Sequence, residues 1–213
     1  MGIITGSGSF TRYLAPGPLP EGFLEGLSSR IARYAFHYLD ETSVDEHATG
    51  WVNIMNMFDN RFNSLEFLKE PYVAMALRID QRKVPSTALK QYCMEAEETV
   101  KAQEGLEYLP RQRRSDIKEG VRVRLLKRAI PVSKTYDMIW NYTTGLVIFG
   151  CLNAKVCDRF AEIFFQTFDI HLQAICPHFL AEKRIQKTDP SVELSDQLTP
   201  WQFTKETPDA TAG

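Results

Sequence analysis

The spacing of apolar and polar positions predicts strands at intervals along the chain. Tyr136, Met138, Trp140 and Tyr142 alternate with Thr135, Asp137, Ile139 and Asn141, and a Thr143-Thr144-Gly145 turn and an apolar run follow, which indicates a hairpin. A mostly apolar run at residues 72–79 is typical of a central strand. We expect strands at residues 10–15, 51–57, 72–79, 136–142, 146–152 and 172–176.

Helical periodicity fills most of the intervals between these strands. Pro85 and Pro110 stand where helices favour their first residue, and Gly105 stands where the first of the two helices ends. Asn153 is a good N-terminal cap for a further helix. We expect helices at residues 21–34, 85–105, 110–128 and 153–168.

This order of elements predicts an α+β fold, with antiparallel or mixed sheets, packed helices and a protruding helical pair. We expect residues 1–185 to form one functional region, in which two α+β sheet portions are joined by the helical pair at about 85–128. Residues 186–213 are polar and contain prolines, so we expect a C-terminal tail there.

Composition limits the class of protein. A hydrophobic content of 44% in 213 residues is enough for a substantial core. The four cysteines include no C-x-x-C pair, so no disulfide framework is expected and a reducing cytoplasm suits them. The first ten residues lack the features of a signal peptide, and the longest apolar run, at 146–152, is too short to cross a bilayer. We therefore expect a cytoplasmic protein without membrane contact.

Charge is distributed unevenly along the chain. Residues 111–134 hold nine basic and two acidic residues, a local charge of +7, which leaves −9 on the remainder and −2 overall. On a helix, Ile117, Val121 and Leu125 form an apolar stripe with cations on both flanks. The basic residues of the segment are Arg111, Arg113, Arg114, Lys118, Arg122, Arg124, Lys127, Arg128 and Lys134. Arg82 and Lys83 either extend this patch or mark a polar strand end.

A row of cations with so few acids indicates phosphate binding, because each neutralised phosphate also releases condensed counterions. The alternative is a solvated helix face with extended charged side chains. Charge alone leaves DNA, RNA and an acidic protein open as the ligand.

Catalytic patterns are missing from the sequence. No glycine loop has the spacing of a phosphate-binding loop, and the single Cys176-Pro177-His178 pairing does not make a zinc site. Asp80, Asp137 and Asp158 lie near element ends, where capping and turn roles explain them. We therefore expect no enzyme, no catalytic residue, no metal and no cofactor.

Two sets of side chains have a core interpretation beside a functional one. Aromatic residues on the hairpin can stack bases, although such residues more often fill a core, which we favour here. They are Tyr136, Trp140, Tyr142 and Phe149. Cys93, Cys151 and Cys157 are interpreted as buried free thiols.

Several blocks together resemble the bacterial recombination-associated RdgC family. The most specific is the stretch from Leu125 to Thr135, with its Leu-Leu-x-Arg-Ala pattern ahead of the hairpin. Further blocks are Val84 to Lys90, Gly145-Leu146-Val147 and Gly50-Trp51-Val52. The resemblance covers most of residues 8–178 and consists of order and spacing, not of a catalytic signature.

The resemblance implies a nucleoid-associated homodimer that closes around double-stranded DNA with little sequence preference and limits access by a recombinase. The family's basic inner surface corresponds to residues 111–134, with Arg82 and Lys83, and Ile130 and Pro131 lie near a subunit contact. Typical members carry a further C-terminal portion, so a C-terminally reduced member is expected, in which an open dimer is the alternative to a closed ring. A metal-dependent nuclease and a module that binds an acidic protein through its basic helix remain the other candidates.

Overall fold

The computed structural model describes residues 3, 6, 8–40 and 42–188. The chain divides into two compact units, Met1–Gln173 and Ala174–Gly213. In the second unit, the described part contains helix α5 (Pro177–Thr188), in which the Lys183 ammonium lies 5.2 Å from the centre of the Phe179 ring. This helix crosses the boundary at 186 where a polar tail was expected, and the rest of that expected tail lies outside the described residues.

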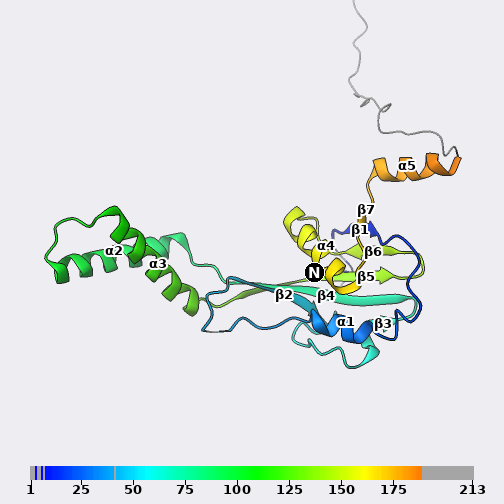
Figure 1. The fold of residues 1–213 in the computed structure, drawn as a ribbon, viewed down its shortest axis with the longest axis horizontal. Coiled ribbons are helices and arrows are strands. Elements are labelled where there is room, and N and C mark those ends of the chain that lie inside the picture. The colour runs from blue at the N-terminus through cyan, green and yellow to red at the C-terminus, as the bar shows by residue number, and fades with distance from the viewer. Residues whose placement is uncertain (1–2, 4–5, 7, 41, 189–213) are drawn as a thin grey trace, which may run out of the picture. The chain divides into compact units, whose positions relative to one another are not determined.

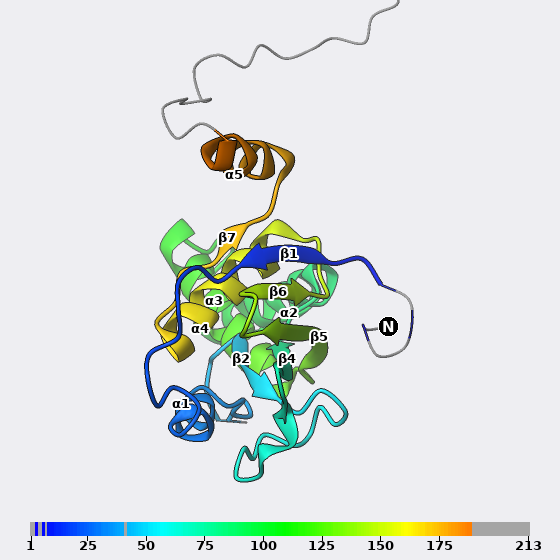
Figure 2. The same cartoon turned by 90° about the vertical axis from the view of Figure 1, so that its right-hand side faces the viewer.

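The described strands form one antiparallel sheet, which confirms the α+β class (Figure 1). Its order is β2-β4-β5-β6-β1-β7, and β3 pairs with β4. Figure 2 shows β1, β6, β5 and β4 following one another across the sheet. The strands are β1 (Thr11–Leu14), β2 (His47–Val52), β3 (Leu68–Lys69), β4 (Tyr72–Gln81), β5 (Val132–Asn141), β6 (Leu146–Phe149) and β7 (Gln173–Ala174).

The centre of the sheet is the pair formed by β4 and β5, which runs from Tyr72 opposite Asn141 to Gln81 opposite Val132. The sequence predicts two sheet portions, and the structure differs because these portions pair into a single sheet. The physical reason is the helical pair between the two strands. Its two helices run out and back, so the start of β5 returns beside the end of β4.

Most helices lie where the apolar spacing predicts them. Gly105 ends α2 in the left-handed conformation with φ of 63°, and the Asn153 side chain accepts a hydrogen bond of 3.3 Å from the Val156 amide at the start of α4. The first helix begins later than expected, because residues 21–26 form turns. The helices are α1 (Leu27–Arg33), the 3₁₀ turn η2 (Leu65–Phe67), α2 (Ser86–Glu104), α3 (Arg111–Arg128) and α4 (Ala154–Phe168). None of the helices among the described residues is long and apolar enough to cross a membrane.

The main core lies between one face of the sheet and helices α1 and α4. The Phe160 ring of α4 stacks on Phe149 of β6 at 3.9 Å between ring centres, and Trp51 Nε1 donates a 2.8 Å hydrogen bond to Thr167 Oγ1. Trp140 and Phe149 are fully buried here, so these two rings serve the core and offer no base-stacking surface, whereas Tyr136 and Tyr142 are half-buried at the edge of the core. Cys151 is buried as expected, whereas Cys93 and Cys157 are half-buried, and all three are free thiols.

Candidate nucleic-acid interface

Helices α2 and α3 form an antiparallel pair beyond the ends of β4 and β5 (Figure 1). The pair has a small core, in which Leu109, Val121 and Leu126 are buried, and no residue of α2 is buried. Val121 confirms the predicted apolar stripe, while its companions Ile117 and Leu125 are half-buried. Because so little apolar surface is covered, most side chains of both helices are available to solvent or to a ligand.

Carboxylates of α2 face several cations of α3. Arg113 Nη2 lies 2.7 Å from Glu104 Oε1, and Arg114 Nε lies 3.9 Å from Glu97 Oε2. Residues 86–128 together contain ten basic and seven acidic residues, a net charge of +3. The +7 excess of residues 111–134 is therefore partly balanced in the folded pair, which the charge count along the chain does not show.

Other cations of the predicted patch are engaged by the protein itself. Arg122 forms ion pairs with Glu46, in the loop before β2, and with Glu119 at 3.8 Å. The Arg124 guanidinium lies 5.9 Å from the centre of the Tyr92 ring. These contacts hold the side chains over α2 and over the start of β2, so a polyanion must compete for them.

Four exposed cations of α3 remain free of such competition. Within the described part of the chain, no carboxylate lies within ion-pairing distance of Arg111, Lys118, Lys127 or Arg128. Lys127 and Arg128 occupy the last turn of α3, where the helix dipole favours positive charge. These four residues, here called the free cations of α3, are the most accessible part of the predicted interface.

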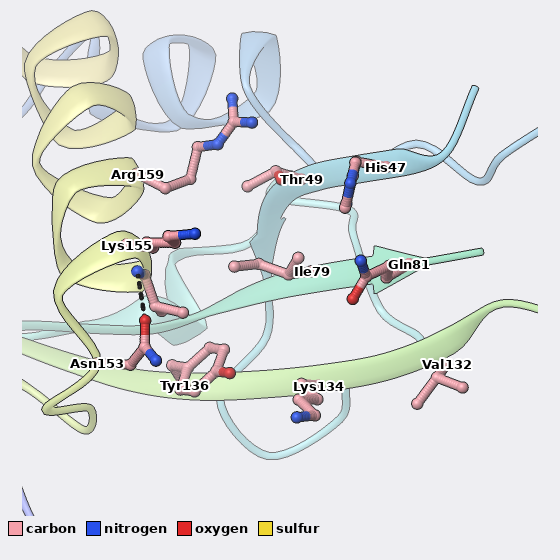
Figure 3. A pocket seen from close by; sticks show the side chains of 11 residues that line it. His47, Thr49, Ile79, Gln81, Val132, Lys134, Tyr136, Asn153, Lys155 and Arg159 are labelled. Atoms are coloured by element: carbon pink, nitrogen blue, oxygen red, sulfur yellow. Dashed lines mark hydrogen bonds between the residues drawn. The ribbon is translucent and has the colours of Figure 1, made fainter. Parts of the chain in front are cut away.

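Lys134 lies apart from α3, on β5, where its side chain borders a groove over the sheet (Figure 3). Lys155 and Arg159 of α4 border the same groove, although neither residue belongs to the segment that the sequence singles out. Lys83 is exposed just after β4, and its place in the patch stays a prediction.

Arg82 has a different role from the predicted one. Its side chain is buried, and its guanidinium donates hydrogen bonds of 3.2 and 3.5 Å to the carbonyl oxygens of Ser43 and Leu39. The residue therefore ties the loop before β2 to the end of β4. Because this guanidinium is enclosed, we remove Arg82 from the candidate DNA contacts.

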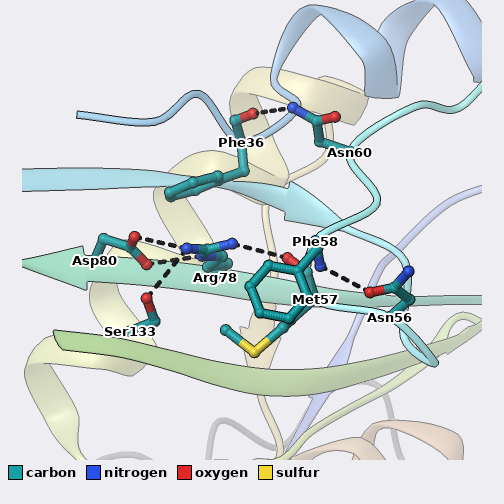
Figure 4. A network of polar contacts seen from close by, with 8 residues as sticks. All are labelled: Phe36, Asn56, Met57, Phe58, Asn60, Arg78, Asp80 and Ser133. Carbon is teal, nitrogen blue, oxygen red and sulfur yellow. Dashed lines mark hydrogen bonds and ion pairs between the residues drawn. The ribbon is translucent and has the colours of Figure 1, made fainter. Parts of the chain in front are cut away.

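Arg78 of β4 is also buried, and Figure 4 shows its polar contacts. The Arg78 guanidinium donates two hydrogen bonds of 2.8 Å to the two carboxylate oxygens of Asp80, and this pairing raises the pKa of Arg78. The guanidinium also lies 4.3 Å from the centre of the Phe36 ring. Asp80 is thus the partner of a structural arginine, a role beyond the turn or capping role expected for it.

The candidate dimer contact lies between α3 and β5. Ile130 is 87% exposed and its neighbour Val132 is 62% exposed, while Pro131 is half-buried. An isolated pair of exposed apolar side chains is compatible with a subunit contact, and that contact stays a prediction.

Together these features define a class: an α+β protein whose antiparallel sheet carries a partly neutralised basic helical pair at one end. Residues 20–211 match the family described as "Putative exonuclease, RdgC". The match spans most of the 213 residues, so the chain belongs to the RdgC family, and the predicted resemblance is confirmed. Membership supports a recombination-associated DNA-binding protein at the level of the family. No curated protein matches the chain.

Proposed function

We propose that this protein binds double-stranded DNA through its phosphates, without reading the base sequence. The observation that carries the proposal is the set of free cations of α3, which no carboxylate of the described chain neutralises. Lysine and arginine side chains on an exposed helix can contact consecutive phosphates, and the released counterions favour the complex. Family membership supports DNA as the ligand over RNA or an acidic protein.

A gel-shift series across salt concentrations, with duplex, single-stranded and RNA probes, tests this proposal. The decisive variant removes three free cations, as Lys118→Gln, Lys127→Gln and Arg128→Gln together. We expect its affinity for duplex DNA to fall by about tenfold or more, and the slope of log affinity against log salt to fall by about one for each lost phosphate contact.

The matched control removes the same charge from exposed residues elsewhere, as Arg12→Gln, Arg61→Gln and Lys69→Gln. Equal loss of affinity in both variants would show that net charge matters and that α3 is not the interface. If the wild-type protein shifts no nucleic acid even at low salt, an acidic protein becomes the better candidate for the partner of α3.

We propose binding without cleavage, although the family description names an exonuclease. Among the described residues, no group of three or more His, Cys, Asp or Glu side chains is placed to hold a metal ion. Incubation of end-labelled duplex with Mg²⁺ or Mn²⁺ tests this part. Shortening of the label that a chelator prevents would assign a nuclease activity and end the proposal of simple binding.

The proposed form is a homodimer that encloses or clamps DNA on the nucleoid and limits access by a recombinase. Exposure of Ile130 and Val132 supports a contact between copies at this place. Sedimentation analysis of Ile130→Asp tests it, because a buried carboxylate strongly disfavours an apolar contact. A dimer of unchanged stability in this variant would place the subunit contact elsewhere.

A further inference from the structure

A groove of about 490 Å³ opens on the face of the sheet that carries α4 (Figure 3). Three strands build its floor in register. Thr49 of β2 lies opposite Ile79 of β4, and Ile79 lies opposite Lys134 of β5. The first turns of α4 form its wall, from which Lys155 and Arg159 extend over the strands. The groove exists because α4 covers only part of this face.

The charged side chains that line the groove are all positive. Among the eleven residues that line it, Lys134, Lys155 and Arg159 are cationic and none is Asp or Glu. Lys134 and Lys155 have no carboxylate within ion-pairing distance in the described part of the chain, and Arg159 Nη1 lies 3.8 Å from Glu162 Oε2. Cations that converge from two elements repel one another, so a bound anion stabilises this arrangement.

The floor adds a second kind of surface. Ile79 and Tyr136 of the floor and Val156 of the α4 wall are half-buried and apolar or aromatic, and polar groups of Thr49 and Gln81 lie beside them. An apolar floor with a few polar groups and a cationic rim is the usual composition of a site for a small organic anion. Cations that were merely solvated on a flat surface would have no such floor.

We propose that this groove binds a nucleotide, with the phosphate on Lys134, Lys155 and Arg159 and the base against Ile79 and Tyr136. Its volume lies within the range of about 300–1,000 Å³ that small ligands occupy. The three cations of this site belong to β5 and α4, so the site is separate from the free cations of α3. Two kinds of ligand present this combination of a phosphate and a base: a free nucleotide and an unpaired nucleotide within a single DNA strand.

A strand has a path out of the groove. Thr49 and Arg159 also line a second hollow of about 230 Å³, whose other walls include Arg33, His37 and the carboxylate of Glu162, the ion-pair partner of Arg159. A further phosphate of a strand meets Arg33 there. A free nucleotide gains nothing from this hollow, and this difference separates the two sources.

Isothermal titration of the full chain with deoxyadenosine monophosphate, adenosine and a short oligo-dT strand tests the proposal. We expect the monophosphate to bind at least about tenfold more tightly than adenosine, because only the monophosphate engages the cations. Lys155→Gln with Arg159→Gln should weaken the monophosphate by about tenfold, while Arg61→Gln with Lys69→Gln should not change it. Both pairs are exposed and remove the same charge.

The outcomes separate this site from duplex binding. The triple variant of α3, with Lys118→Gln, Lys127→Gln and Arg128→Gln, should bind the monophosphate with unchanged affinity. The double variant Lys155→Gln with Arg159→Gln should still shift duplex DNA in the gel. Equal binding of adenosine and monophosphate, unchanged binding in the groove variant, or no binding of either nucleotide probe overturns the proposal. An oligo-dT affinity that exceeds the monophosphate affinity and falls with Arg33→Gln assigns a strand, and equal affinities assign a free nucleotide.

Discussion

The sheet region and the helical pair are stabilised in different ways. Between the sheet and helix α4, Phe149 and Phe160 stack within a core of fully buried aromatic side chains. Between α2 and α3, Leu109, Val121 and Leu126 are the buried apolar side chains, and ion pairs such as Arg113 with Glu104 join the exposed faces. Exposed ion pairs contribute about 0–1 kcal/mol each, far less than a buried aromatic ring.

The sheet region and the helical pair therefore have different physical roles within one unit. Most buried apolar side chains lie in the sheet region, while the helical pair exposes its charged side chains and buries few apolar ones. Elements with few buried contacts open locally before the whole domain unfolds. The proposed DNA interface therefore lies on the part of the unit that adapts most easily to a ligand.

The largest expected effect on stability follows from removing one ring of the aromatic core. Phe160→Ala removes a fully buried ring that stacks on Phe149 and touches Trp51, so we expect a loss of about 3–5 kcal/mol in the free energy of unfolding. Urea unfolding followed by circular dichroism measures it. A loss below about 1 kcal/mol would mean that the aromatic core of the sheet region contributes little to the stability of the protein.

A similar loss is expected from the buried ion pair on the other face of the sheet. Asp80→Ala leaves the Arg78 guanidinium charged and only 4% exposed, at a cost of about 3–5 kcal/mol. The control is Asp59→Ala, which breaks a pair between half-buried Asp59 and the exposed Arg61, together with one hydrogen bond from the Arg61 amide, and should cost about 1 kcal/mol. Arg78→Met with Asp80→Leu should recover most of the stability, and no recovery would point to the carbonyl contact with Met57 as the essential one.

A local effect is expected in the helical pair. Leu109 is fully buried in the turn between α2 and α3, so Leu109→Ala should remove about 2–3 kcal/mol of packing from this pair. We expect faster amide hydrogen exchange along α2 and α3, with unchanged protection in β4 and β5. Equal acceleration in the strands would mean that the pair and the sheet unfold as one unit.

The two regions also differ in how far the sequence predicts them. The central strand β4, the hairpin, both long helices and the Asn153 cap follow from local spacing and from proline, glycine and asparagine positions. In contrast, β2 (His47–Val52) begins before the range 51–57 expected for it, and β3 was not expected. The pairing of β4 with β5 depends on contacts across some sixty residues of sequence, a separation that periodicity does not report. Helix α5 is a missed local signal, because Pro177 stands at its first position.

The sequence predicts the accessibility of the basic residues less well than it predicts the helices and strands. Glu97 and Glu104 precede the basic segment in sequence, yet they face Arg114 and Arg113 once α2 folds against α3. Arg82 is enclosed by a loop that covers the end of β4, which no local pattern indicates. Lys155 and Arg159 join Lys134 through sheet and helix packing alone. Count and sign of charge are readable in a sequence, whereas partners and exposure are properties of the fold.

The smallest expected effect concerns Cys93, which reports on the seam between α2 and α3. Burial raises the pKa of the Cys93 thiol, nearby Glu97 raises it further, and Lys118 opposes them. Since the thiolate is the reactive form, Cys93 should be alkylated more slowly than an unhindered cysteine at neutral pH, with a pH midpoint above the ordinary value. Lys118→Gln should slow the reaction by a further factor of about two, and Glu97→Gln should speed it by a similar factor. Iodoacetamide labelling followed by mass spectrometry, with the exposed Cys176 as the internal reference, measures both changes. If neither substitution shifts the rate at Cys93 while Leu109→Ala accelerates it, opening of the helical pair governs access to the thiol, and the seam is even weaker than its few buried contacts indicate.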